Sequence, residues 1–544
     1  MTSRTSYRDP GRAVVRVLLA VVAGTSTQAT LSAGVPAAHA RAAETRAAES
    51  PGRSLTLADA IAGALAKNED IRVERVALDS AKAALVGAKG AYDPQLTVDA
   101  GWRSVTTPVN SAFSGAPEGA AAPSDRTAEA SASVQQLLPT GGLLSVTTDS
   151  SRATTNGAFA LLSPAYQTQL GLELRQPLLR DRGIDPARLT IRVAAADRDR
   201  AAGSFRQQVT DTVAAVERAY WGLVAARRAV GVQEEAVALA SQQLHETQAR
   251  IESGSAPENE IAQPRAELER RRGDLLAARE AAARAQTALK VLILGDEAQA
   301  WSERLDPVDG IAIAVRPVDV AEAMKQALAS RPELKVAEAG VARRRVEAAF
   351  AHDQLRPALD LVASYSRFGL AGSQNPAAST IPGVSGALPT GLEGDLHDAL
   401  RQLGRRDFDD ARMALELRVP IGNRTARANA AVARNAEVQA QADVSRARKA
   451  VRADVLNAAA ATETAGARIE AARAAREAAE IQLAAEEDRF KAGLSTNFLV
   501  LTRQNDLAAA RLAEIQALTD YRTALTELAR ATGSLLEARR IELE

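Results

Sequence analysis

Side chains able to do covalent or metal chemistry are few in this sequence of 544 residues and lie far apart. It contains no cysteine, which excludes disulfides, thiolate metal ligands and cysteine nucleophiles. No P-loop or nucleophile elbow occurs, and the histidines lack metal-ligand spacing. These histidines are His39, His245, His352 and His397. Basic and acidic residues balance at 67 each, so no charge excess points to nucleic acid. The sequence therefore predicts no enzyme, no cofactor and no nucleic-acid partner.

The N-terminus has the pattern of an export signal. Four arginines precede an apolar run from Val17 to Gly24, and Ala38-His39-Ala40 is a cleavage site of the A-x-A type. We expect residues 1–40 to be a signal peptide and residues 41–53 to be an exposed segment. The apolar run is shorter than the roughly 18 residues of a membrane helix, and no later run is long enough. Without such a helix, a chain crosses a membrane only as a closed barrel.

The remainder of the chain is a duplication. Three landmarks of the first half recur in the same order in the second half. They are Leu55-Thr-Leu-Ala-Asp-Ala60 with Val318-Asp-Val-Ala-Glu-Ala323, Leu172-Glu-Leu-Arg-Gln-Pro177 with Leu415-Glu-Leu-Arg-Val-Pro420, and Arg250-Ile-Glu-Ser-Gly254 with Arg489-Phe-Lys-Ala-Gly493. We expect one repeat over residues 54–295, a connecting loop over 296–317, a second repeat over 318–536 and a tail over 537–544.

Each repeat is predicted to contain one very long helix. Apolar residues such as Phe205, Val209, Val213 and Val216 recur at three- and four-residue steps, and no proline interrupts residues 187–250 or 424–491. A run of about 65 residues makes a rod of roughly 100 Å, which is too long for a globular core. Such rods must pack side by side.

Shorter helices should pair into rods of matching length. We expect a helix after Gly254 to about residue 294, stacked end to end on another over residues 318–352. A C-terminal helix over 497–539 would stack in the same way on the N-terminal one over 57–91. The helices would then form a wall.

Short strands with one apolar face are predicted at four places, residues 96–102, 170–174, 359–365 and 413–419. A soluble sandwich would turn the apolar face inward, and a membrane barrel would turn it toward lipid. The export signal and the rods favour the barrel. Polar loops are expected over 108–123 and 369–404. The first repeat alone has a further hairpin near residues 128–150, either extra barrel strands or a loop hairpin.

Several short motifs accompany the predicted helices and strands in a fixed order. They are Tyr92-Asp-Pro94, Ala219-Tyr220-Trp221, Val419-Pro420-Ile-Gly-Asn-Arg424 and Arg489-Phe-x-x-Gly493-Leu-Ser495. Their ordered, duplicated set resembles the TolC family of outer-membrane efflux and export channels over residues 54–536. The resemblance implies a mostly α fold with β structure, in which three chains close a twelve-stranded outer-membrane barrel, four strands each. That barrel continues into a long periplasmic coiled-coil barrel.

The resemblance also implies a function and partners. The chain would be the passive exit duct of a tripartite efflux pump or type I secretion system. It would work as a homotrimer in outer-membrane lipid, with a periplasmic adaptor (membrane fusion) protein and an inner-membrane RND-type pump or ABC exporter. The alternative from the residues alone is a periplasmic coiled-coil scaffold or adaptor-like protein without a pore, which would have no need of two-faced strands.

The two helix-to-helix turns are the adaptor-docking end in the family. The residues carried over by resemblance are Arg250, Gly254, Ser255, Arg489, Gly493, Leu494 and Ser495. Locally, each glycine is expected to end its helix in the left-handed conformation, and Ser255 or Ser495 to cap the next helix.

The family often closes the entrance with a ring of aspartates just beyond the second turn. Leu499 and Thr502 stand there instead, so Leu499 either forms an apolar constriction or packs between helices. Glu258 and Glu260 either supply entrance charge or stabilise a helix N-terminus. Pro264 is expected to kink the helix that contains it.

Aromatic residues at strand ends are predicted to form a girdle at the lipid interface, with lone core aromatics as the alternative. They are Tyr92, Trp102, Tyr166, Tyr365 and Phe368. Tyr220 and Trp221, in the middle of a long helix, are expected to pack in the interior.

Overall fold

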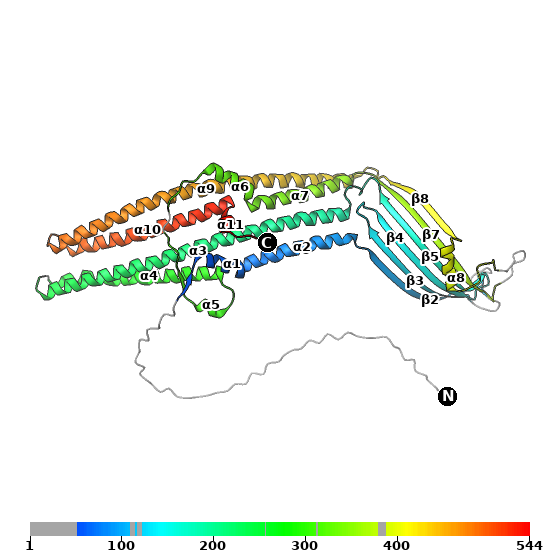
Figure 1. Ribbon diagram of the computed structural model, residues 1–544, viewed down its shortest axis with the longest axis horizontal. Coiled ribbons are helices and arrows are strands. Elements are labelled where there is room, and N and C mark those ends of the chain that lie inside the picture. Colours follow the sequence, from blue (N-terminus) through cyan, green and yellow to red (C-terminus); the bar gives the residue numbers. More distant parts are fainter. Residues whose placement is uncertain are drawn as a thin grey trace, which may run out of the picture. The chain divides into compact units, whose positions relative to one another are not determined.

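The computed structural model describes residues 52–108, 115–116, 122–255, 257–311, 314–378 and 388–543. The predicted signal peptide lies outside these ranges. Within them, the chain is mostly helical with one large antiparallel sheet at one end of the helices (Figure 1). No helix among the described residues has the length and apolarity that a membrane crossing requires.

The duplication is visible as the same order of elements twice. The first repeat has α1 (Leu57–Lys67), α2 (Glu69–Lys89), β2 (Gln95–Thr106), β5 (Leu162–Pro177), α3 (Pro186–Glu252) and α4 (Ala262–Ile293). The second has α6 (Val320–Ser330), α7 (Pro332–Asp353), β7 (Ala358–Gln374), β8 (Asp409–Arg418), α9 (Arg424–Lys491) and α10 (Asn497–Thr532). Small elements join them: β1 (Arg53–Leu55), η1 (Gly90–Tyr92), η2 (Glu258–Ile261), α5 (Ala298–Ser302), β6 (Leu305–Pro307) and α11 (Leu535–Ala538).

The predicted long helices are confirmed, since α3 has 67 residues and α9 has 68. α3 begins where the side chain of Asp185 accepts the backbone N–H of Arg188, with Pro186 in the first turn. The predicted single helices over 57–91 and 318–352 are each broken. Asn68 caps α2 with its own side chain, and Pro332 holds the preceding Arg331 in an extended conformation.

The helices lie side by side in a wall (Figure 1). α3 packs against α4 and α10 on the side of the helix turns, and against α2 and α7 on the side of the sheet. α9 packs against α10 and α7 over the same two stretches.

The expected end-to-end stacking is wrong, because helices stack within a repeat. Asn68 Nδ2 donates to the carbonyl of Leu292, 3.2 Å away, which joins α4 to the α1–α2 break. Arg331 Nη1 donates to the carbonyl of Ala531 at 3.3 Å, which joins α10 to the α6–α7 break. The C-terminal carbonyls of α4 and α10 therefore accept hydrogen bonds from polar side chains at the α1–α2 break and the α6–α7 break, respectively.

The sheet has six strands in the order β2-β3-β4-β5-β7-β8, all antiparallel. The extra hairpin of the first repeat forms β3 (Ser124–Leu137) and β4 (Leu143–Thr155), which enter the sheet between β2 and β5. The four strands per chain implied by the family resemblance are therefore corrected to six. The hairpin adds strands to the sheet because β3 pairs along its length with β2, and β4 pairs along most of its length with β5.

The second repeat has a helix where the first has the hairpin. β7 and β8 pair directly, and between them in sequence stands α8 (Leu396–Arg405). The loop expected over residues 369–404 is therefore shorter, since β7 continues to Gln374. Parts of both predicted loops, residues 109–114, 117–121 and 379–387, lie outside the described residues.

The interior packs around the middle of α3, as expected for Tyr220 and Trp221. Both side chains are buried, and their rings meet edge to face with centroids 5.3 Å apart. Tyr220 Oη donates to Asp309 Oδ2 at 2.6 Å, and burial together with this bond raises the pKa of the phenol. The guanidinium of Arg522 covers the Trp221 ring at 4.4 Å.

An ion pair between the buried carboxylate of Glu217 and the partly exposed guanidinium of Arg539 fixes the C-terminal tail to α3. Glu217 is fully buried, and it accepts from Arg539 Nε at 2.5 Å, Arg539 Nη2 at 2.8 Å and Thr526 Oγ1 at 2.6 Å. The bidentate geometry satisfies both carboxylate oxygens, which offsets the cost of removing the charge from water.

Arg539→Ala should destabilise the protein, by about 1–3 kcal/mol, because the buried Glu217 carboxylate loses its two hydrogen bonds from the partly exposed guanidinium. The midpoint of thermal unfolding in detergent is the measurement. Glu217→Gln on the Arg539→Ala background should restore part of the loss, since the remaining amide carries no charge. Arg540→Ala is the matched control, with little expected change. Equal losses from Arg539→Ala and Arg540→Ala would contradict this account.

Candidate functional site

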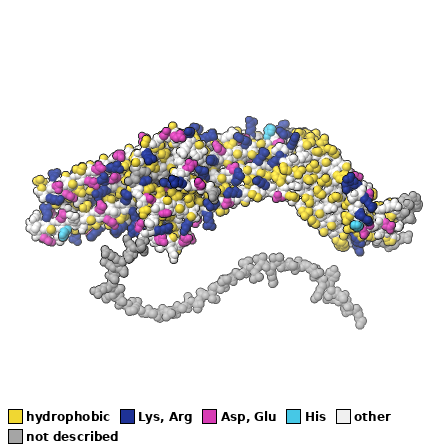
Figure 2. Space-filling view, viewed as in Figure 1, with side chains coloured by type: hydrophobic (Ala, Val, Ile, Leu, Met, Phe, Trp, Pro, Cys, Tyr) yellow, Lys and Arg dark blue, Asp and Glu magenta, His cyan; other side chains and the backbone are white. Residues whose placement is uncertain are grey.

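One face of the sheet is apolar and exposed. The strand register places apolar side chains from every long strand on this face. The outer part of β4 is the exception, because its side chains on this face are polar. They include Leu96, Val98, Ala100, Val134, Val146, Leu170, Leu172, Ala363, Met413, Leu415 and Leu417. Figure 2 shows apolar side chains gathered over the sheet in this view.

The opposite face of the sheet is polar. Asp99, Glu129, Asp149, Gln167 and Gln169 line an open hollow of about 820 Å³. Toward the helices, a network of ion pairs crosses β5, β7 and β8 on this face. Arg175 Nη2 lies 2.8 Å from Asp360 Oδ2 and 2.9 Å from Glu416 Oε2, and Arg418 Nη2 lies 3.0 Å from Asp360 Oδ2. One face is therefore suited to hydrocarbon and the other to water.

The predicted aromatic girdle is partly corrected. Trp102 and Tyr166 lie in one row of the strand register on the apolar face, and Tyr365 lies on the same face nearer the helices. Phe368 is three residues beyond Tyr365, so it falls on the polar face and lines the hollow; its place in the girdle was wrong. Tyr92 lies in η1 before β2. A lipid-interface role for the other four remains a prediction.

The helix turns have the predicted glycine geometry. Gly254 has φ of 72° and Gly493 of 73°. The N–H of Ser255 donates to the carbonyl of Arg250, and that of Leu494 to Arg489, each at 2.8 Å, in a Schellman arrangement. The predicted serine caps are wrong. Ser495 Oγ donates back to Glu486, and Ser255 Oγ pairs with Ser253 Oγ at 3.1 Å.

The two turns are tied to each other, and the second is apolar. The Arg250 guanidinium lies 5.0 Å from the centroid of the Phe490 ring, in a cation–π contact between the repeats. Leu494 is 73% exposed and Phe498 is 61% exposed. The sequence did not single out Phe490 or Phe498 as contact residues, although large apolar residues so close to the turn at Gly493 are a signal of a contact surface.

The gate candidates lie beside these turns. Glu258 and Glu260 are exposed in η2. Leu499 is 38% exposed, so it does not pack between helices of its own chain; Val500 and Leu501 are the buried neighbours. Thr502 Oγ1 donates to the carbonyl of Phe498 at 2.8 Å.

The kink predicted at Pro264 is wrong. α4 begins at Ala262, so Pro264 stands in its first turn, where the missing N–H has no partner to lose. A 3₁₀ turn, η2, replaces the helix that was expected before it.

Polar contacts join the two repeats along α10, near the turns. Arg511 Nη1 lies 2.6 Å from Glu235 Oε2, and Gln243 Nε2 donates to Asn497 Oδ1 at 2.8 Å. Arg270 Nη2 donates to Asn505 Oδ1 at 2.9 Å. No periodicity in the sequence pairs these residues, because they belong to different repeats. Among the described residues, no group of three or more His, Cys, Asp or Glu could hold a metal ion.

A two-faced antiparallel sheet that continues into a wall of long helices defines the fold of TolC-like channel subunits. Solved structures with this fold include the outer membrane channel CmeC of Campylobacter jejuni, at 15% identity, TM-score 0.61, and 88% and 86% coverage of this chain and of CmeC. The MtrE outer membrane channel of Neisseria gonorrhoeae matches at 17% identity, TM-score 0.58, and 88% and 89% coverage. VceC of Vibrio cholerae matches at 15% identity, TM-score 0.58, and 88% and 96% coverage.

Sequence comparison points the same way. Residues 323–534 match the family model described as outer membrane efflux protein. A comparison with curated protein sequences gives no match. This family match lies within the second repeat, and the solved structures share the fold over 88% of the chain.

A charged or conformationally restricted residue at the turn that contains Gly493 and Leu494 should abolish export without dissociating the subunits. Leu494→Arg would place a charge in the exposed apolar surface, and Gly493→Pro cannot adopt a positive φ. Export by a strain carrying each variant, and the oligomer mass in detergent, are the measurements. Ala492→Ser is a conservative control at the neighbouring position. Normal export by the Leu494→Arg variant would show that this turn is not a docking surface.

Neutralising the exposed carboxylates of η2 tests the entrance charge. If Glu258 and Glu260 face the ion path, the double variant Glu258→Gln, Glu260→Gln should reduce the preference for cations over anions in single-channel recordings. Glu252→Gln, at the end of α3, is the control. Unchanged selectivity would leave these carboxylates only the role of stabilising the helix N-terminus.

Proposed function

We propose that this chain is the outer-membrane channel of an export machine, an exit duct for small molecules or secreted polypeptide. The observation that carries the proposal is the sheet with one apolar and one charged face, whose strands lead directly into helices of 67 and 68 residues. Such a sheet fits a barrel wall with lipid outside and water inside. The rods fit a duct across the periplasm.

The edges of the sheet argue for assembly. β2 and β8 each pair on one side only among the described strands, so each presents a row of unpaired backbone groups. In hydrocarbon each such group costs several kcal/mol, so only a closed barrel is stable there. A single chain has too few strands to enclose a water-filled lumen. Pairing β8 of one copy with β2 of the next closes the sheet by cyclic symmetry.

Three copies, the number that the family resemblance implies, would give a barrel of eighteen strands, because the sheet of each copy has six. Barrels of 16–18 strands leave an aqueous channel. This barrel would be wider than the twelve-stranded one that the family resemblance implies.

The partners proposed are a periplasmic adaptor protein at the helix turns and an inner-membrane RND-type pump or ABC exporter that supplies the energy. The exposed Leu494 and Phe498 beside Gly493 support a protein contact at this end. The outer membrane is the proposed location of the sheet, and the periplasm that of the helices.

A pair of neighbouring substitutions on β8 tests the proposal. Leu415 lies on the apolar face and Ala414 on the polar face. Leu415→Arg should greatly reduce the amount of protein inserted in the outer membrane, because arginine facing lipid costs about 2–4 kcal/mol in each subunit. Ala414→Arg should insert normally and alter conductance.

The unsubstituted protein should be a trimer in detergent and give discrete conductance steps in a planar bilayer. If Leu415→Arg and Ala414→Arg behave alike, and the purified protein gives no steps, the chain is a coiled-coil scaffold without a pore.

A further inference from the structure

A short helix lies on the apolar face of the sheet at the end farthest from the long helices. α8 packs against β7 and β5, and the carbonyl of Ala399 accepts from Thr168 Oγ1 at 3.2 Å. A Cβ on Gly369 would come within 2.0 Å of the same carbonyl, so this close approach requires glycine. Thr168 and Gly369 belong to the apolar face. α8 is therefore outside the proposed lumen.

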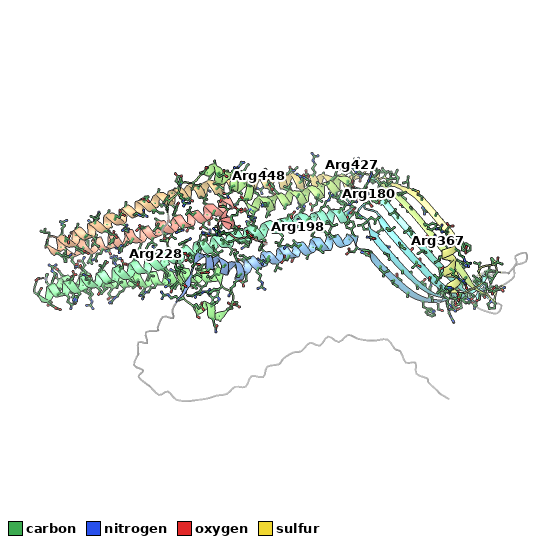
Figure 3. The ribbon with its side chains drawn as sticks, viewed as in Figure 1. Arg180, Arg198, Arg228, Arg367, Arg427 and Arg448 are labelled. Atoms are coloured by element: carbon green, nitrogen blue, oxygen red, sulfur yellow. The ribbon has the colours of Figure 1, made fainter. Side chains whose placement is uncertain are left out.

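Side-chain contacts fix α8 to the sheet. Gln402 Oε1 accepts the N–H of Leu370 at 2.8 Å, and its Nε2 donates to the carbonyl of Leu370 at 3.0 Å. Arg367 Nη1, on β7, donates to the carbonyl of Leu403 at 3.0 Å (Figure 3). A capping box of Asp395 and Asp398 begins the helix. These contacts give α8 a defined position.

The exposed surface of α8 is amphipathic. Leu396 and Leu400, one turn apart, are 40% and 43% exposed, and Phe408 just beyond the helix is 47% exposed. Arg401, Arg405 and Arg406 are also exposed. Arg401 pairs with Asp398, and no ion pair is recorded for Arg405 or Arg406 among the described residues.

α8 lies where the apolar face becomes polar. The row of the strand register that contains Thr168 and Gly369 also contains Ser150, and the next row outward contains Arg152 and Tyr166. Arg152 Nε donates to Tyr166 Oη at 3.4 Å. Trp102 stands in that same outer row. Tryptophan, tyrosine and arginine are the residues that mark a boundary between lipid and water.

The acidic residues around α8 are largely engaged. Asp395 and Asp398 form the capping box, and Asp409 Oδ2 accepts from Tyr365 Oη at 3.4 Å. Asp407 and Asp410 remain exposed. Neither forms an ion pair with Arg405 or Arg406 among the described residues, and Asp410 pairs in register with Ser366 on the polar face. The guanidinium groups of Arg405 and Arg406 can therefore offer paired N–H groups to a phosphate.

We propose that α8 is an interfacial helix that lies in the headgroup layer of the outer membrane's outer surface. Leu396, Leu400 and Phe408 enter the edge of the hydrocarbon, and Arg405 and Arg406 bind the phosphate groups of anionic lipid. The assignment rests on the proposed function, because it requires the apolar face of the sheet to meet lipid. Continuity of α8 with that face, together with its free arginine surface, identifies lipid as the partner.

The absence of cysteine makes the test direct, because one introduced cysteine labels one site. The variants Leu400→Cys, Leu415→Cys and Ala414→Cys are labelled with a fluorophore and reconstituted in phosphatidylcholine vesicles that contain brominated lipid. Bromine near the headgroup should quench the Leu400 site more than bromine deep in the chain. The Leu415 site should be quenched by at least one of the two lipids, and the Ala414 site by neither.

The arginines are tested by adding phosphatidylglycerol to the vesicles. Anionic lipid carrying headgroup-proximal bromine should increase quenching at the Leu400 site, and Arg405→Gln with Arg406→Gln should remove the increase while the protein stays inserted. An increase that survives both substitutions would overturn the phosphate contact.

Quenching at Leu415 without quenching at Leu400 would overturn the interfacial helix alone and leave α8 to a protein or to water. No quenching at either site would overturn the proposed function instead, so the two failures are distinguishable.

Discussion

The requirement that every backbone N–H and C=O group find a partner governs this structure. Among the described strands, the β2 and β8 edges of the six-stranded sheet have no partner, which would be most costly in hydrocarbon, where no water can replace the missing strand. The apolar face that would meet lipid and the charged face that would meet water follow from simple alternation along each strand. In the proposed function, a closed ring of copies would satisfy both the edges and the faces, and it would set the position of the helices that continue from the strands.

A second constraint acts on the long helices, because each has only a narrow apolar face. α3 and α9 cannot bury a wide apolar stripe, so they pack against two helices in each half and interleave apolar contacts with ion pairs. Polar contacts such as Arg511 with Glu235 connect the repeats near the turns, where few apolar side chains are buried. Apolar burial is concentrated instead around Tyr220 and Trp221, where the C-terminal tail also attaches through Arg539. We therefore expect local stability to be greatest midway along α3 and lower at the turns, where the buried apolar cluster is smaller.

The two repeats differ most at the outer end of the sheet. At the same point in each repeat, the first inserts β3 and β4 into the sheet and the second inserts α8 onto its face. The hairpin widens the sheet by two strands, whereas α8 covers the rows in which the apolar face becomes polar. The family match lies in the second repeat, whose β7 and β8 are direct neighbours, and not in the first, in which the hairpin separates β2 from β5.

The elements that have local sequence signals could be predicted from the amino-acid pattern alone. Uninterrupted apolar steps predicted α3 and α9, alternation predicted the two-faced strands, and glycine predicted the left-handed turns at Gly254 and Gly493. Some errors were local, namely the serine caps and the kink at Pro264, and the larger ones concern relations between distant residues. Contacts in the folded chain were needed to show that helices stack within a repeat, that the hairpin enters the sheet, that Phe368 faces the hollow and that α8 lies on the apolar face. Local patterns are fixed by backbone sterics and side-chain periodicity, whereas strand neighbours and helix stacking depend on which distant carbonyls and side chains meet, and no spacing along the chain encodes that.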